Sequence, residues 1–291
     1  MRRYAIIGFG EVGSIFARDL GAAGATIHAF DTADAARDRA RAAGCTPHAS
    51  GAEAARGAEV VFISVTAGSA LAAAQALAGG LAHAPFVVDV NSVSPSTKQA
   101  AAQAVEQAGG RYVEAAVMAS VPPKGLRSPM LLGGLHAAAF AEHMAWLGMD
   151  LTPFSAELGR ASAVKMCRSV MIKGLEALTT ESMLAARHYG VEDAVIRSLG
   201  DTLPHEDWRG LARYMVGRAL LHGKRRAEEM REVARTVQEA GVAPLLSGPI
   251  AERQDWAWLQ GRAMTPAQRA APDLEGLLDA LAAVARNPPK E

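Results

Sequence analysis

A glycine-rich segment near the start of the chain, GFGEVG at residues 8–13, limits the possible folds more than any other feature of the sequence. It follows a β-rich run and opens a helical one, with its glycines in the GxGxxG spacing. In a strand–turn–helix unit the first glycine permits a tight turn, the second lets the backbone approach a pyrophosphate, and the third allows close packing of helix on strand. The phosphates then lie at the helix N-terminus. We therefore expect a dinucleotide to bind at Gly8, Phe9, Gly10, Glu11, Val12 and Gly13.

An acidic residue at the end of the second predicted strand bears on the choice of dinucleotide. Asp31 lies 18 residues after Gly13, where a carboxylate can accept hydrogen bonds from the adenosine ribose. A carboxylate there would repel the 2′-phosphate of NADP, so the sequence favours NAD. Two alternatives stay open: Asp31 could simply cap the following helix, and Arg37 or Arg39 could reach a 2′-phosphate, which keeps NADP possible.

Residues 1–120 alternate β-rich runs with alanine-rich helical stretches, a pattern that is typical of βα units and a parallel sheet. The predicted strands are residues 4–7, 25–30, 59–65, 86–90 and 111–117. The predicted helices are residues 11–23, 33–43, 69–78 and 95–108. The pattern predicts an α/β fold that begins with a doubly wound parallel sheet of the Rossmann type.

The second half of the chain is predicted to be almost entirely helical. A helix at residues 136–147 and a short strand or loop at 151–156 come first. The helices after Gly159 are then residues 160–189, 191–200, 206–222, 224–240, 245–259 and 274–286. We expect an NAD(P)-binding Rossmann domain at residues 1–159 and an all-α C-terminal domain for substrate binding and dimerisation at 160–291.

Two short polar segments follow later strands of the predicted sheet. SVTAG begins at Ser64 and NSVSP begins at Asn91. Loops at the carboxyl ends of parallel strands lie where ligands bind, so we expect contacts with the adenosine ribose and the nicotinamide respectively. The residues expected to make them are Val65, Thr66, Asn91 and Ser92. Plain helix capping by Thr66, Ser92 and Ser94 is the alternative, and the two roles are compatible.

Lys165 is the candidate catalytic residue. It lies early in the long helix predicted at 160–189, and Val164, Cys167 and Met171 place it at the edge of an apolar helix face. Desolvation lowers the pKa of a partly buried lysine, which suits general acid/base chemistry on a hydroxyl. Ser169 is four residues later and therefore on the same helix face. From the residues alone, a surface lysine with its stem along apolar side chains is an alternative.

The chain resembles the β-hydroxyacid dehydrogenases, which include 3-hydroxyisobutyrate dehydrogenase and, more distantly, 6-phosphogluconate dehydrogenase. The matching features are GFGEVG, the strand and loop DVNSVSP near residue 90, a strand leading to residues 114–120, and the spacing from Gly159 to Lys165. In that family the lysine at this position is the catalytic acid/base. The resemblance implies the same role for Lys165, with Ser169 beside it where the family carries asparagine.

Other positions depart from the family pattern. The family's substrate loop reads D-x-P-V-S-G-G, whereas this chain has EAAVMAS at residues 114–120, from which Met118 and Ser120 are the expected substrate contacts. The family's late lysine–aspartate pair aligns with Glu228 and Glu229. These changes indicate a divergent subgroup with an atypical C-terminal domain.

A basic cluster is the candidate replacement for the missing substrate loop. His222, Arg225, Arg226 and Glu229 follow the i, i+3, i+4, i+7 spacing of adjacent helix faces. Arginine binds carboxylate or phosphate in a bidentate fork, so we expect His222, Arg225 and Arg226 to hold an anionic group of the substrate. A solvated helix face with Arg–Glu pairs at i, i+4 explains the same residues equally well.

Composition excludes several other classes of protein. The 291 residues suit two domains, and 30 basic against 30 acidic residues give zero net charge, which argues against nucleic acid as a partner. The apolar stretches are shorter than the roughly 20 residues of a membrane span. Cys45 and Cys167 lack metal-ligand spacing, so no metal is expected. A strand from residue 4 leaves no room for a signal peptide, and we expect a cytoplasmic protein.

These observations predict an NAD(P)-dependent oxidoreductase. It would transfer a hydride between the nicotinamide and a small hydroxy or keto compound that carries a carboxylate or phosphate, with Lys165 as general acid/base. An imine reductase of the same superfamily is an alternative, although such enzymes typically carry Asp or Tyr at the lysine position. A non-catalytic dinucleotide-sensing protein is another. The helical second half suggests a homodimer.

Overall fold

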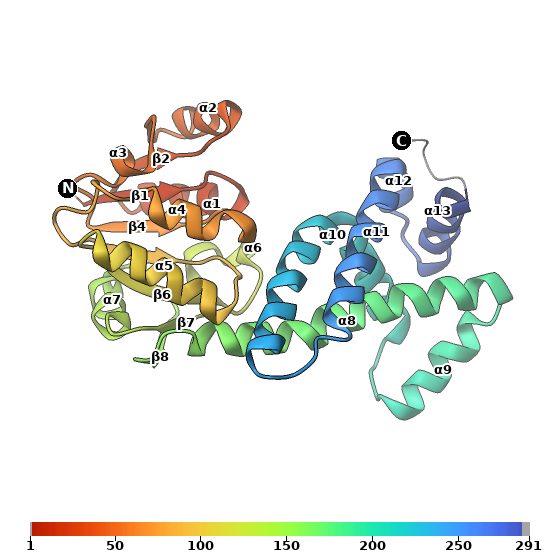
Figure 1. Cartoon of the computed structure of the whole chain (residues 1–291). Coiled ribbons are helices and arrows are strands. Elements are labelled where there is room, and N and C mark those ends of the chain that lie inside the picture. Colours follow the sequence, from red (N-terminus) through yellow and green to blue (C-terminus); the bar gives the residue numbers. More distant parts are fainter. Residues whose placement is uncertain (1, 287–291) are drawn as a thin grey trace. The chain divides into compact units, whose positions relative to one another are not determined.

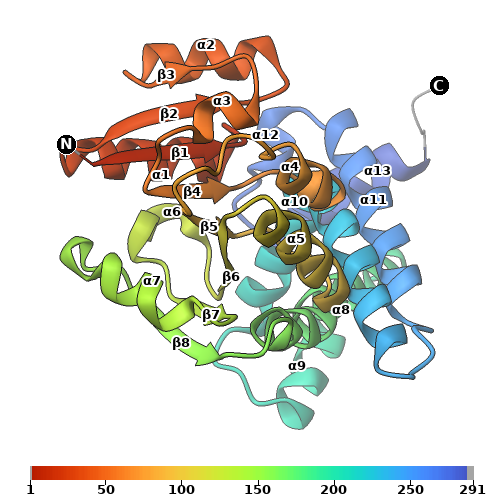
Figure 2. The same ribbon diagram turned by 60° about the vertical axis from the view of Figure 1, so that its left-hand side comes forward.

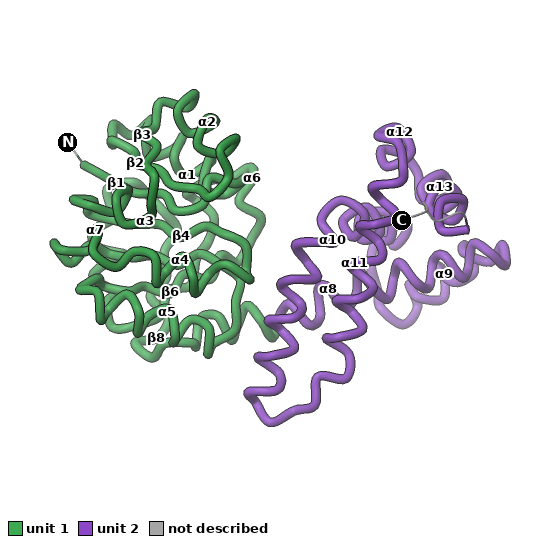
Figure 3. The backbone as a smooth tube through the Cα atoms, turned by 45° about the horizontal axis from the view of Figure 1, so that its top comes forward, with its two compact units in different colours: residues 1–167 green, residues 168–291 purple. Residues whose placement is uncertain are grey.

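The structure, a computed structural model that describes residues 2–286, divides into two compact units. Unit 1 is Met1–Cys167 and unit 2 is Arg168–Glu291 (Figure 3). The division falls inside helix α8 (Arg160–Tyr189), eight residues after the boundary suggested at residue 159. The start of α8 packs on unit 1, where a Cβ on Gly159 would lie 3.0 Å from Pro95. Lys165 is therefore part of unit 1.

Unit 1 is built on an eight-stranded sheet in the order β3-β2-β1-β4-β5-β6-β7-β8 (Figure 1). All neighbouring strands are parallel except β6 and β7. The strands are β1 (Arg3–Ile7), β2 (Thr26–Phe30), β3 (Thr46–Pro47), β4 (Val60–Ile63), β5 (Phe86–Asp89), β6 (Arg111–Val117), β7 (Met130–Gly133) and β8 (Leu151–Ser155). The predicted fold class is confirmed, and the strand order reverses between β1 and β4, where such sheets bind ligands.

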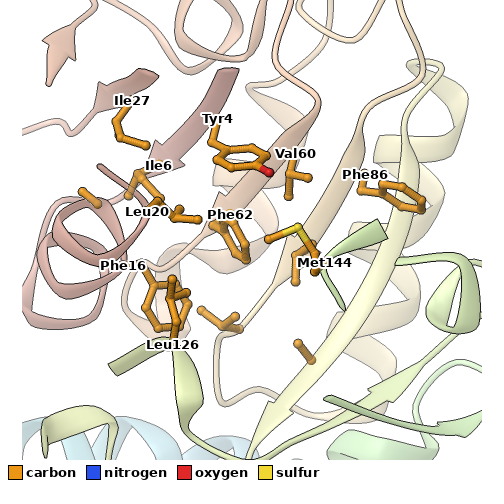
Figure 4. Packing of buried hydrophobic residues seen from close by; sticks show 14 of the residues in the cluster. Tyr4, Ile6, Phe16, Leu20, Ile27, Val60, Phe62, Phe86, Leu126 and Met144 are labelled. Atoms are coloured by element: carbon orange, nitrogen blue, oxygen red, sulfur yellow. The ribbon is translucent and has the colours of Figure 1, made fainter. Parts of the chain in front are cut away.

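Helices cover both faces of the sheet (Figure 2). One apolar layer packs against α1 (Glu11–Ala22), α2 (Asp34–Ala42) and α7 (Ala137–His143). The other packs against α3 (Gly51–Ala55), α4 (Ala70–Gln75) and α5 (Pro95–Gln107). Successive strand residues point to opposite faces, so Tyr4 and Ile6 join the first layer (Figure 4) while Ala5 and Ile7 join the second.

The first layer is held partly by aromatic contacts. The rings of Phe16 on α1 and Phe62 on β4 meet edge to face with centroids 5.5 Å apart (Figure 4). Such a pair adds about 0.5–1.5 kcal/mol to the stabilisation from burial alone. This contact fixes α1, whose N-terminus begins at the glycine turn, against the middle of the sheet.

Several elements of unit 1 escaped the sequence prediction. Strand β3 has two residues, and β7 reads MLLG without the alternation of a half-buried strand, because three of its four residues are buried. The short helices α3 and α6 (Val121–Lys124) were also missed. Residues 151–155 form the edge strand β8, consistent with the predicted strand or loop.

Unit 2 contains only helices in its described part, namely the end of α8, α9 (Glu192–Thr202), α10 (Trp208–Glu239), α11 (Ser247–Ala263), α12 (Pro266–Arg269) and α13 (Leu274–Arg286). The predicted break near Gly223 is wrong, because α10 runs through it without interruption. A Cβ on Gly223 would overlap the carbonyl oxygen of Gln254, so this glycine permits close crossing of α10 and α11 rather than ending a helix. None of the described helices combines the length and apolarity of a membrane span.

Candidate functional site

The turn after β1 depends on two of its three glycines for internal packing. Gly8 has φ +93°, and a Cβ there would overlap the backbone of Ser64 and lie 2.8 Å from Val65 on the loop after β4. A Cβ on Gly13 would overlap the carbonyl oxygen of Gly8. The close approach of these backbones brings the turn against the β4 loop at the point where the strand order reverses.

Gly10, the middle glycine, is not required by the protein itself. Its φ of −81° is open to any residue, and a Cβ built on it meets no described atom within 4 Å. It is exposed, and it is the N-cap of α1 with no side-chain cap hydrogen bond, which leaves helix N–H groups to an outside acceptor. The free space around Gly10, its lack of a side chain and the N–H donors at the start of α1 together fit the pyrophosphate of a dinucleotide.

This difference between the glycines leads to a prediction. Gly10→Ala should leave the free energy of unfolding within about 1 kcal/mol of the wild type but raise the dissociation constant for the dinucleotide by about tenfold or more. Gly13→Ala should lower thermal stability as well. Gly21→Ala, which adds a methyl to open space elsewhere on α1, is the matched control. Calorimetric titration and thermal unfolding would test these variants, and unchanged affinity in Gly10→Ala would contradict the interpretation of the turn.

Asp31 follows β2 and binds the turn directly. Its Oδ2 accepts the Phe9 N–H at 2.8 Å and its Oδ1 accepts the Ala33 N–H at 2.9 Å. Arg37 donates to the Asp31 carbonyl oxygen at 2.5 Å, and Arg39 donates to the Phe9 carbonyl oxygen at 3.3 Å. The carboxylate joins β2 to the glycine turn and to the start of α2, while the two arginines bind backbone carbonyl oxygens of the same region, so contact with the ribose and a local structural role are both open to Asp31.

Asn91 links the loops after β4 and β5. Its Oδ1 accepts the Val65 N–H at 2.8 Å, and its Nδ2 donates to Asp89 Oδ1 at 2.7 Å. The bonds fix which end of the amide faces each partner. Because Val65 also packs beside Gly8, the structure brings the predicted cofactor residues of β1, β4 and β5 into one continuous group.

A fully buried ion pair, between Lys98 and Asp89, holds the Asn91 side chain in place. Lys98 Nζ lies 3.0 Å from Asp89 Oδ1 and donates to the Asp89 carbonyl oxygen at 2.7 Å. The Tyr112 hydroxyl donates to Asp89 Oδ2 at 2.8 Å, and burial, followed by the negative charge of Asp89, holds the Tyr112 pKa well above its usual value. Asp89, Lys98 and Tyr112 are all 0–1% exposed. No local pattern in the sequence indicates this support, although Lys98 is one of only six lysines.

The remaining predicted cofactor residues lie at the same edge of the sheet. Glu11 is exposed and Val12 half-buried on the first turn of α1. The Thr66 and Ser69 hydroxyls lie 3.2 Å apart, and Thr66 makes no side-chain cap. Helix capping applies to Ser94, whose hydroxyl accepts the Thr97 N–H at 3.3 Å. The half-buried Ser92 stays a predicted cofactor contact.

Lys165 lies in the second turn of α8 and is half-buried. The apolar surroundings expected from the sequence are wrong in detail: Val164 is 36% exposed, Met171 is 63% exposed and Cys167 is exposed. The side chain that α8 buries here is Met166. The expected contribution of those three side chains to desolvating Lys165 is therefore small.

The predicted substrate contacts of unit 1 follow β6. Met118 is half-buried, and its N–H donates to the Pro129 carbonyl oxygen at 2.8 Å. Ser120 is exposed at the start of α6. Both lie at the carboxyl end of a strand next to β5, and their contact with a substrate stays a prediction.

Arg225, Arg226 and Ser169 belong to polar contacts inside unit 2. Ser169 Oγ accepts from Lys173 Nζ at 3.1 Å, and Lys173 pairs with Glu229 at 2.6 Å. Arg225, on the exposed side, pairs with Glu229 at 3.0 Å, whereas the buried Arg226 pairs with Glu176. Burial raises the pKa of Glu176, and the nearby Arg226 opposes this shift. His222 is half-buried.

Because of these contacts, the arginines of the predicted basic cluster have different partners and different surroundings. Arg225 and Arg226 each have a carboxylate partner, and they differ in exposure, so the positions do not form one solvent-facing surface. A substrate anion at Arg226 would compete with Glu176. Lys173 and Glu176 could not be associated with this cluster from the sequence, because they lie on α8, about 50 residues before the segment that contains the arginines.

The doubly wound sheet and the glycine turn define a dinucleotide-binding protein of the Rossmann class with a helical second unit. Residues 3–145 match the NAD binding domain of 6-phosphogluconate dehydrogenase, and residues 186–257 match a domain of unknown function, DUF1932. The chain belongs to the β-hydroxyacid dehydrogenase family, in a divergent subgroup marked by that second domain.

Three solved structures are similar to this chain. A conserved hypothetical protein from Sinorhizobium meliloti is 36% identical, with 97% of this chain and 96% of that chain covered and a TM-score of 0.73. MTH1747, a protein of unknown function described as structurally similar to 3-hydroxyacid dehydrogenases, is 33% identical over 89% of this chain and 99% of its own, with a TM-score of 0.68. The 3-hydroxyisobutyrate dehydrogenase of Mycobacterium tuberculosis shares the fold at 17% identity, with 97% and 99% covered and a TM-score of 0.72.

Proposed function

We propose that this protein is an NAD-dependent dehydrogenase or reductase that acts on the CH–OH group of a small anionic compound, with Lys165 as general acid/base. The proposal rests on membership of the β-hydroxyacid dehydrogenase family and on the lysine at the family's catalytic position. The solved 3-hydroxyisobutyrate dehydrogenase and the domain match to 6-phosphogluconate dehydrogenase are both consistent with oxidoreductase chemistry.

The observation that carries the proposal is the contact between the start of α8 and the start of α5. A Cβ on Gly159 would lie 3.0 Å from Pro95, and Gln99 Nε2 donates to the Leu158 carbonyl oxygen at 3.4 Å. Pro95 directly follows the Asn91–Ser94 loop, which is the predicted nicotinamide contact. The helix that bears Lys165 therefore begins beside a loop of the cofactor edge, within the same compact unit.

The division of chemistry follows from these groups. A bound nicotinamide supplies the hydride acceptor or donor. The Lys165 amine takes the hydroxyl proton of the substrate during oxidation and returns it to the carbonyl oxygen during reduction. Arginine cannot perform this step at ordinary pH because it does not lose its proton. Ser169, one helical turn after Lys165, is proposed to hydrogen-bond the substrate.

The substrate class is proposed from the cations and polar groups available to hold it. In unit 1, Met118 and Ser120 after β6 are proposed substrate contacts. In unit 2, His222, Arg225 and Arg226 are the proposed ligands of a carboxylate or phosphate, and an anion at Arg226 would have to displace Glu176. Arg225 supports this part best, because it is exposed and its guanidinium has capacity beyond its single bond to Glu229. We also propose that the protein is cytoplasmic and acts as a homodimer.

The choice of NAD over NADP leads to a second prediction. Asp31→Ser removes a carboxylate that would accept from the ribose hydroxyls and repel a 2′-phosphate, so kcat/KM with NAD should fall by about tenfold or more. With NADP it should rise or stay constant, because Arg37 and Arg39 remain. Asp38→Ser, an exposed change on the same helix whose carboxylate pairs with Arg41 rather than with Arg37 or Arg39, is the control. Steady-state kinetics with both cofactors would measure the ratio, and an unchanged ratio would contradict the proposed role of Asp31.

A turnover screen tests the proposed function as a whole. Purified protein would be assayed with NAD and NADP against β-hydroxy acids, hydroxy-phosphates, their keto forms and cyclic imines. We expect turnover of an anionic hydroxy or keto compound. Reduction of imines alone would favour an imine reductase, and NAD binding without turnover of any compound would favour a dinucleotide-sensing protein.

A further inference from the structure

We propose that Glu114 is a positioning residue for Lys165: its buried carboxylate fixes the first turn of α8 and thereby the location of the amine. This inference rests on the proposed function. Glu114 lies on β6, next to Asp89 in the strand register, and is 0% exposed. A carboxylate on a solvated face needs no partner within the protein, whereas a fully buried one does.

The carboxylate receives two hydrogen bonds from the backbone of α8. The Gly159 N–H donates to Glu114 Oε2 at 2.7 Å, and the Ser162 N–H donates to Oε1. The Gly159 carbonyl oxygen accepts the Ala163 N–H at 2.9 Å, so Gly159 is the N-cap residue of the helix. Glu114 thus binds the N-cap and the third helical residue together.

The helix needs this support because its own N-cap has no side chain. Gly159 has φ +95°, and a Cβ there would lie 3.0 Å from Pro95, so a serine or aspartate cap would be strained and crowded. The N–H groups of a first helical turn otherwise lack partners, and burial without partners is costly. A carboxylate from another strand satisfies them and also interacts favourably with the positive end of the helix dipole.

The carboxylate is itself held in place by the adjacent strand. Glu114 pairs in register with Gly133 on β7, where a Cβ would overlap Glu114 Oε2. The small residue leaves room for the carboxylate to turn toward α8. Sheet, carboxylate and helix start therefore form one rigid connection within unit 1.

This connection ends three residues before the proposed acid/base. Ser162 is bound to Glu114, and Lys165 follows within the next turn of the same helix. Acid/base groups must lie within hydrogen-bond reach of the reacting oxygen, and a displacement of about 1 Å can lower a rate by about 10²-fold. The structure thus assigns to Glu114 an effect on turnover that does not pass through cofactor binding.

The test compares Glu114→Gln with the wild type in kcat, substrate KM and the NAD dissociation constant. The amide offers only one acceptor oxygen, and its NH₂ group opposes one of the two helix N–H groups. We expect kcat to fall by about 10- to 100-fold, NAD affinity to change less than about threefold, and the amides of residues 159 and 162 to exchange hydrogen faster. Glu157→Gln is the control, since it removes an exposed carboxylate near the same helix end.

Each outcome decides the inference. A normal kcat in Glu114→Gln would overturn it, and so would an equal loss of NAD affinity, which indicates general disruption. If that variant does not fold, Gly133→Ala displaces the carboxylate without removing it and should lower kcat. In the wild type, amide hydrogen exchange at residues 159 and 162 that is as fast as in an uncapped first turn would also overturn the inference. Full activity of Lys165→Met would instead contradict the proposed function, whereas the hydrogen bonds from the Gly159 and Ser162 N–H groups to Glu114 would not be called into question.

Discussion

Lys165→Met should lower kcat by about two to four orders of magnitude, which is the usual contribution of a positioned acid/base group. Methionine keeps the length and apolar stem of lysine but cannot exchange a proton. The residue is half-buried on α8, outside the glycine turn and the Asp31 region, so NAD affinity and thermal unfolding should stay close to wild type. Initial-rate kinetics on the substrate found by the screen, combined with calorimetric NAD titration, would measure both effects.

Two further variants separate proton transfer from charge. Lys165→Arg retains the positive charge without an accessible neutral form, so it should be nearly as inactive as Lys165→Met. Lys224→Met removes an exposed lysine from α10 and should be fully active. Substantial activity in Lys165→Arg would indicate that the residue holds an anion rather than a proton, and the proposed mechanism would then be wrong.

Lys98→Met should be the most destabilising of the substitutions considered, by about 3–5 kcal/mol. Lys98 and Asp89 are both completely buried, and removal of the ammonium leaves the carboxylate with the bonds from Asn91 and Tyr112 but without a counter-ion. Urea unfolding would measure the loss. Because Asp89 orients Asn91, which in turn holds the Val65 N–H, NAD affinity should also decrease.

The double variant Asp89→Asn with Lys98→Met supplies the control. An uncharged amide can still accept from Asn91, and no buried charge is left unpaired, so the double variant should regain much of the stability that Lys98→Met loses. Additive losses would show instead that the two side chains act independently. In that case the buried pair would not be the source of the stability.

The parts of the fold that could be predicted from sequence share a local cause. The GxGxxG turn and the strands beside it have strong periodic or glycine signals within a few residues, and the sheet follows from them. The errors arise where tertiary contact overrides local pattern. Gly223 has the sequence signature of a helix end, yet it lies inside α10 because α11 crosses there. Strand β7 has no polar alternation because three of its four residues are buried.

The candidate site shows the same limit. The residues around the turn and the loops after β4 and β5 were identifiable because each directly follows a strand end. The buried side chains that hold them were not, since Lys98 reads as an ordinary helical lysine and Glu114 as part of an altered substrate loop. Their roles depend on partners 9 and 45 residues away along the chain. Such distances have no periodic signal in a single sequence.

The two backbone hydrogen bonds of Asp31 have a consequence for altering the cofactor preference of this enzyme class. The carboxylate that we propose to discriminate against a 2′-phosphate also accepts the N–H groups of Phe9 and Ala33. The same side chain would therefore set both the cofactor selectivity and the rigidity of the turn. A substitution of Asp31 that improves the use of NADP would leave the Phe9 and Ala33 N–H groups without their acceptor. A successful switch would require a compensating acceptor first, so we expect evolutionary or engineered paths to NADP to pass through a second residue rather than through Asp31 alone.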